Sequence, residues 1–75
     1  MIPYKNLSGN SGVVAYELGE EFIKVRFRHE PQAYVYDTKR PGRDHVRKMK
    51  KLAADGQGLS TYISQHVREN YARTE

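Results

Sequence analysis

Apolar and charged residues alternate along residues 22–28, with Phe22 as the one apolar exception, and this is the most regular pattern in the chain. Every second residue from Ile23 to Phe27 is apolar, and the basic residues between and after them are Lys24, Arg26 and Arg28. A period of two is typical of a strand with one buried face. A second apolar run, residues 13–18, precedes it across the turn residues Gly19 and Glu20. The two runs predict an antiparallel hairpin.

A short third strand is predicted over residues 33–36. The turn residues 29–32 separate it from the second strand, and they include Pro31, which cannot donate to a β-ladder. Within the strand, Tyr34 and Tyr36 point to one side and the residues between and before them to the other.

The apolar period lengthens after Pro41 and Gly42. The next apolar residues follow helical spacing and form one stripe of an amphipathic helix: Val46, Met49, Leu52 and Ala53. Gly56 stands where a left-handed residue commonly ends a helix. A second helix is predicted after Gly58, with apolar residues four apart at Leu59, Ile63 and Val67.

Strands followed by helices, without alternation between them, predict an α+β fold. We expect a three-stranded antiparallel meander followed by two helices packed on one face. Residues 1–12 are rich in turn formers and predict a flexible N-terminal arm. A single domain then spans residues 13–71, and residues 72–75 form a polar tail.

The length of 75 residues allows one small hydrophobic core. No cysteine is present to form a disulfide, so the fold depends on packing, with dimerisation as a further source of stability. The absence of cysteine also fits a reducing compartment. No apolar run resembles a signal peptide or a membrane span, and we therefore expect a cytoplasmic protein without membrane contact.

The order of these motifs resembles that of the KTSC domain, a small module found at the C-terminus of some lysyl-tRNA synthetases and as a stand-alone bacterial protein. The matching segments are Val14-Ala15-Tyr16, Ile23-Lys24-Val25-Arg26-Phe27, Tyr34-Val35-Tyr36 and the stretch from Gly58 to Arg68. The resemblance covers roughly residues 10 to 71. It implies no established activity and no catalytic residue, and its suggested role is RNA binding.

Basic residues are concentrated in one part of the chain. Of the 13 lysines and arginines, seven fall between Lys39 and Lys51, opposed only by Asp44. These seven are Lys39, Arg40, Arg43, Arg47, Lys48, Lys50 and Lys51. Such asymmetry is expected of a surface that contacts phosphate. The alternative is the ordinary solvated side of an amphipathic helix, which accounts for Lys48 and Lys51 better than for the residues that precede the helix.

The basic face of the second strand admits two interpretations. Lys24, Arg26 and Arg28 form a line of charge long enough to follow two or three phosphates. Cations on an exposed strand also discourage edge-to-edge aggregation. Both interpretations predict the same residues.

Tyr34 and Tyr36 likewise have two possible functions. If they lie on the open sheet face beside Lys24 and Arg26, their rings can stack bases of single-stranded nucleic acid. If they face the helices, they supply bulk to a core that has only two phenylalanines and no tryptophan.

The three histidines, His29, His45 and His66, show no metal-ligand spacing, and no metal or other cofactor is expected. His66 paired with Arg68 would suit a small ribonuclease, but the chain offers no second acid or base whose placement can be argued. The Gly56-Gln57-Gly58 segment lies between two helices and predicts a turn rather than a phosphate loop.

The sequence thus predicts a non-enzymatic module that binds RNA or another single-stranded nucleic acid, mainly through phosphate contacts. The alternative is a protein-interaction or homo-oligomerisation module. The candidate nucleic-acid-binding residues are Lys24, Arg26, Arg28, Tyr34, Tyr36, Lys39, Arg40, Arg43, Arg47 and Lys50.

Overall fold

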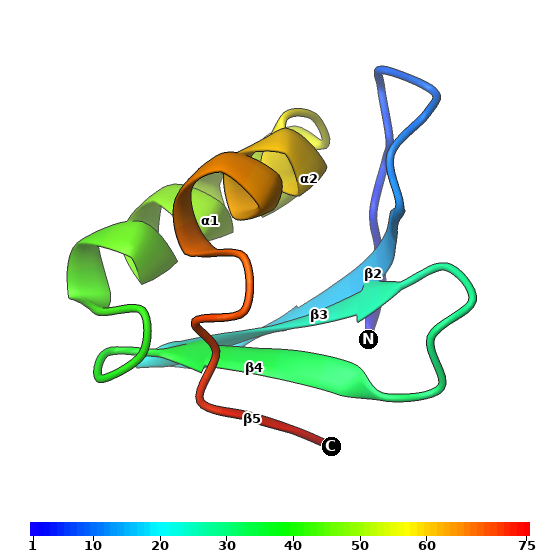
Figure 1. The fold of residues 1–75 in the computed structure, drawn as a ribbon. Helices are drawn as coiled ribbons and strands as arrows, with labels where there is room; N and C mark the ends of the chain where they lie inside the picture. Colours follow the sequence, from blue (N-terminus) through cyan, green and yellow to red (C-terminus); the bar gives the residue numbers. More distant parts are fainter.

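A computed structural model describes all residues from 1 to 75 and contains one antiparallel sheet covered on one face by helices (Figure 1). The sheet has five strands in the order β1-β2-β3-β4-β5. They are β1 (Ile2–Pro3), β2 (Val13–Leu18), β3 (Phe22–Phe27), β4 (Ala33–Asp37) and β5 (Arg73–Thr74). The central meander of β2, β3 and β4 is the part of the sheet that the sequence pattern predicts, and the α+β class is confirmed.

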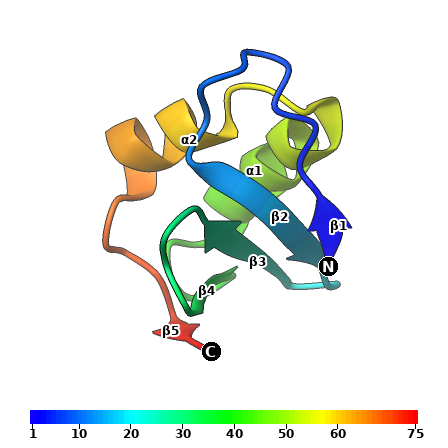
Figure 2. The same cartoon turned by 90° about the vertical axis from the view of Figure 1, so that its right-hand side faces the viewer.

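Two helical segments follow the meander. Helix α1 (Arg43–Asp55) ends at Gly56, whose φ of 82° is left-handed and whose N–H donates to the carbonyls of Leu52 and Ala53. Helix α2 (Leu59–Tyr62) continues directly into the π-helical turn η1 (Ile63–Val67). Figure 2 shows α1 and α2 lying across the same face of the sheet, with β1 and β5 at its two edges.

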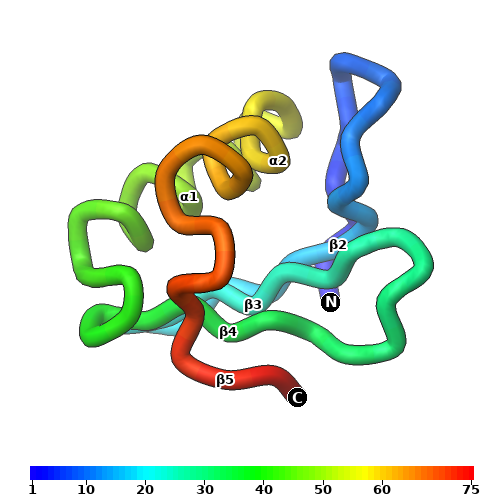
Figure 3. Tube along the Cα trace, in the orientation of Figure 1, coloured from blue at the N-terminus to red at the C-terminus, as the bar shows by residue number.

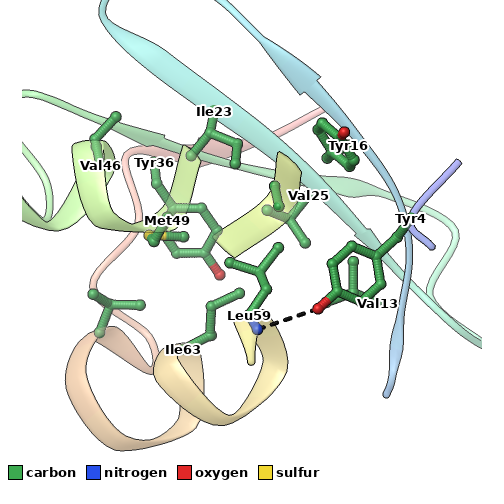
Figure 4. Close-up of a cluster of buried hydrophobic side chains, with 12 residues drawn as sticks. Tyr4, Val13, Tyr16, Ile23, Val25, Tyr36, Val46, Met49, Leu59 and Ile63 are labelled. Carbon is green, nitrogen blue, oxygen red and sulfur yellow. Dashed lines mark hydrogen bonds between the residues drawn. The ribbon is translucent and has the colours of Figure 1, made fainter. Parts of the chain in front are cut away.

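The core lies between this sheet face and the helices. In the register of β3 and β4, Ile23 is opposite Tyr36 and Val25 is opposite Tyr34. Side chains directly opposite in an antiparallel pair share a face, so both tyrosines point to the side of the buried Ile23 and Val25. From the helices, Met49 and Leu59 contribute fully buried side chains to the same cluster (Figure 4).

The expectation of a flexible arm over residues 1–12 is wrong for its first part. Ile2 and Pro3 pair with β2, and the Tyr4 ring is 7% exposed within the core. The Tyr4 hydroxyl accepts a hydrogen bond of 3.3 Å from the Leu59 N–H (Figure 4), and the Leu7 N–H donates to the Gly56 carbonyl at 2.7 Å. The sequence does not predict these contacts, because the segment is rich in turn residues and β1 is too short to show a periodic pattern.

The C-terminal residues expected as a polar tail also belong to the domain. After η1 the chain turns toward the sheet and runs beside β4, as the tube in Figure 3 shows. The Ala72 N–H donates to the Val35 carbonyl, and the backbones of Ala33 and Glu75 exchange two hydrogen bonds of 2.8 Å. The predicted boundaries of 13 and 71 are therefore too narrow at both ends.

Candidate nucleic-acid interface

The outward side of α1 and the turn before it carry most of the exposed cations that the sequence singles out. Arg43, Arg47 and Lys51 are four residues apart, which aligns them on one helix face. Arg47, Lys48 and Lys51 line one shallow depression of about 380 Å³ together with Asp44. We refer to the six exposed cations of this region as the basic surface, and they are Lys39, Arg40, Arg43, Arg47, Lys48 and Lys51.

Few of these cations are engaged by other groups of the protein. Lys51 pairs with Asp55 at 3.0 Å, and the Arg40 Nε donates to the Asn70 side chain at 3.0 Å. Arg43 and Arg47 take part in no ion pair. Their guanidinium groups are therefore available to an anionic partner, to which arginine can donate two hydrogen bonds at once.

Lys50, a predicted site residue, lies apart from this surface. Its Nζ donates to the carbonyls of Gly19 and Glu20, the second at 2.9 Å, and the side chain is only partly exposed. Lys50 thus ties α1 to the turn between β2 and β3. Its spacing in the sequence does not distinguish it from its exposed neighbours, because its acceptors lie about thirty residues away in the chain.

The open sheet face holds Lys24 and Arg26, and the helices cover the opposite face. Lys24 is paired there with Glu75 at 2.6 Å and lies 4.0 Å from Glu17, and Glu75 also accepts from Arg73 at 2.7 Å. The hydrogen bond to Glu75 is the main cause that raises the pKa of Lys24. Carboxylates accompany the cations on this face, which makes it a weaker candidate for phosphate binding than the basic surface.

Glu75 gives this face a testable pH dependence. Its hydrogen bond from Lys24, followed by that from Arg73, lowers the pKa of the Glu75 carboxyl. Because the folded pKa is depressed, the stabilisation is present above the ordinary carboxyl pKa and is lost as pH falls through the folded value. We expect Glu75→Gln to melt slightly below the wild type at pH 7, and we expect the difference in Tm to shrink as pH falls through the folded pKa of Glu75. Thermal unfolding followed by circular dichroism measures Tm of the variant and of the wild type at each pH. A difference in Tm that stays the same at pH 7 and at low pH would contradict the stabilising role of the Glu75 ion pairs.

The two tyrosines of β4 do not join Lys24 and Arg26. Tyr36 is 1% exposed and packs in the core, where burial raises its pKa. Tyr34 is half-buried on the same, helix-covered side and contacts Phe27 and Tyr71 edge to face. An open-face stacking platform built from both rings is therefore excluded. Arg28 is exposed beyond the end of β3 and lines a cleft with Tyr34 rather than continuing the row of Lys24 and Arg26.

One cluster of polar and aromatic side chains is not indicated by any pattern in the sequence. His45 of α1 and His66 of η1 have ring centroids 6.5 Å apart, and the His45 Nδ1 shares a 2.7 Å hydrogen bond with the Tyr62 hydroxyl. Twenty-one positions separate the two histidines, and only the packing of α1 against η1 brings them together. No group of three or more metal-ligating side chains is placed to hold a metal ion.

Comparisons of the chain with protein-family models, with curated proteins and with solved structures find no match. None of the helices is both long enough and apolar enough to cross a membrane. The functional assignment therefore depends on the geometry and charge of the chain's own surfaces.

Proposed function

We propose that this protein is a small non-enzymatic module that binds RNA, mainly through contacts between the basic surface and phosphate groups. The observation that carries this proposal is the unpaired state of Arg43 and Arg47 on the outward side of α1, among four further exposed cations. The resemblance to the KTSC domain supports the same function.

The charge distribution favours this surface over the rest of the molecule. The formal net charge is +4, and α1 alone carries five lysines and arginines against two aspartates. From Arg43 to Lys51 the helix rises about 12 Å, at 1.5 Å per residue, so its cations can contact more than one phosphate along a strand. Contacts of this kind supply affinity and register but little base preference.

The salt dependence of binding tests the proposal directly. Binding of a labelled single-stranded oligouridine, followed by fluorescence anisotropy, is expected to weaken steeply with salt, with a slope of about −0.7 in log–log form for each phosphate neutralised. Arg43→Gln with Arg47→Gln is expected to reduce the magnitude of that slope by about 1.4. As a matched control, Arg26→Gln with Arg73→Gln removes two exposed cations from the open sheet face and should leave the slope unchanged.

Three outcomes would contradict the proposal. Absence of binding at low salt would exclude nucleic acid and favour the interaction module, for which concentration-dependent mass in sedimentation is the direct measurement. An equal reduction of the salt slope in the sheet-face control would show that binding depends on the overall charge of the protein and not on the basic surface. RNA that is cleaved by the wild type, but not by His45→Ala or His66→Ala, would make the protein a ribonuclease.

A further inference from the structure

A cleft of about 410 Å³ opens on the helix-covered side of the sheet, and no residue of α1 lines it. It lies between the turn after β3 and the exit from η1, and Tyr34 and Tyr71 line it. Its size falls within the range of about 300–1,000 Å³ usual for small-molecule sites. The basic surface contributes no residue to it.

Aromatic rings form the apolar part of this cleft. Tyr34 lies 4.8 Å from Tyr71 and 5.5 Å from Phe27, measured between ring centroids, with interplanar angles of 89° and 81°. All three side chains line the cleft and are only partly buried. Ring surface is therefore accessible from the cleft, and a planar ligand can stack on it.

Charged groups of both signs surround these rings. Arg28 and Arg68 are the cations of the cleft, and Glu30 and Glu69 are its anions. None of the four takes part in an ion pair. The charge of Glu30 is the largest cause that raises the pKa of the Tyr34 hydroxyl, and Glu69 adds to it, so both carboxylates act close to that ring. The cleft thus offers stacking, carboxylate acceptors and guanidinium donors together.

The backbone at Arg68 is a second indication of a binding site. Its φ of 41° and ψ of −112° lie in a region that glycine adopts far more readily than arginine. The residue directly follows the π-helical turn η1, and both π-turns and strained backbone occur often at functional sites. Its Nε donates to the Ser64 carbonyl at 2.9 Å, which holds the side chain and leaves the terminal guanidinium nitrogens for another acceptor.

We propose that this cleft binds one guanine nucleotide, with the base stacked on one of the two tyrosine rings, a carboxylate of the rim on the base edge and an arginine on the phosphate. Guanine presents two adjacent donors, the N1–H and the N2 amino group, which match the two oxygens of one carboxylate. No other standard base offers two adjacent donors on its Watson–Crick edge. A ligand with a donor-rich aromatic head and an anionic tail also satisfies both charge types in the cleft. This site does not rest on RNA binding by the basic surface.

Titration of the ¹⁵N-labelled protein with guanosine 5′-monophosphate tests the proposal. We expect saturable shifts at the amides of Gly12, Arg28, Glu69 and Tyr71, and binding about tenfold weaker for the adenosine, cytidine and uridine monophosphates. The pentanucleotide UUGUU serves as a second probe. Tighter binding of UUGUU than of both the mononucleotide and UUUUU, with shifts at the same cleft amides, would identify the source as an RNA strand. Tighter binding of the mononucleotide at these amides would identify a free nucleotide, and equal binding of UUGUU and UUUUU without shifts at these amides would contradict the guanine site.

Two exposed positions provide variants that are expected to fold. Glu69→Gln should weaken the guanosine nucleotide selectively and leave the weak adenosine binding unchanged. Arg68→Gly should weaken both nucleotides and raise Tm by several degrees, because glycine relieves the backbone strain. Arg26→Gln, on the open sheet face, is the control and should change neither the nucleotide affinity nor Tm.

Other results would overturn the proposal. These are the absence of shifts with millimolar nucleotide, equal affinity for all four nucleotides, or shifts at the cleft amides with tetramethylammonium but not with the guanosine nucleotide, which would identify an aromatic site for cations. An RNA titration separates this site from the basic surface. If oligouridine binds as proposed while the guanosine nucleotide does not, only the cleft assignment fails.

Discussion

Replacement of both Arg43 and Arg47 by glutamate is expected to weaken the binding of single-stranded RNA by on the order of 100-fold at about 0.1 M salt. Each phosphate contact contributes about 0.7 log units of affinity at this salt through counterion release, so the loss of two contacts gives about 25-fold. The two introduced carboxylates then repel the phosphates, at about 1 kcal/mol for charges 4 Å apart in water. Both positions are exposed, so the fold should be retained.

The matched control for this variant is Arg26→Glu with Arg73→Glu. It makes the same change in net charge outside α1, where Arg26 and Arg73 of the sheet are exposed. If the basic surface is the binding site, the control should lose only the small affinity attributable to net charge. Comparable losses in the two double variants, measured by anisotropy at the same salt, would contradict the assignment. Circular dichroism of both verifies that they are folded.

Replacement of Tyr36 by alanine is expected to cost about 3–5 kcal/mol of unfolding free energy, as for other large buried aromatics. The Tyr36 side chain is 1% exposed and is the largest fully buried side chain in the molecule. A domain of this size has a total stability of about 4–11 kcal/mol, at 0.05–0.15 kcal/mol per residue. The variant should therefore lose a large part of its stability at 25 °C, which urea titration followed by circular dichroism measures.

Two companion variants make this expectation specific. Tyr36→Phe keeps the ring and should change the stability by less than about 1 kcal/mol. Tyr34→Ala removes a ring that is only partly buried and should cost clearly less than Tyr36→Ala. If Tyr34→Ala proved the more destabilising of the two, the burial of these side chains, and with it the placement of the cleft, would be wrong.

Local patterns along the chain specify most of the secondary structure. The alternation from Ile23 to Phe27, the helical spacing of Val46 and Met49, and the glycine at position 56 each act over a few residues. The strand, the helix and the helix end at Gly56 form as these patterns predict. The clustering of Arg43 and Arg47 on one helix face follows from the same short-range geometry. For this reason most of the basic surface can be recognised before any tertiary contact is known, whereas the exclusion of Lys50 depends on its contacts with Gly19 and Glu20.

Only the tertiary structure decides the functions of individual side chains within these elements. The strand that carries Tyr34 and Tyr36 is apolar on both sides, and its pairing with β3, opposite Ile23 and Val25, directs both rings toward the helices. The pairing of Lys24 with Glu75 joins positions far apart in the chain, as does the approach of His45 to His66. The cleft likewise draws on residues from Gly12 to Tyr71. Residue spacing carries information about neighbours within a few positions, whereas these contacts arise when separate elements pack together.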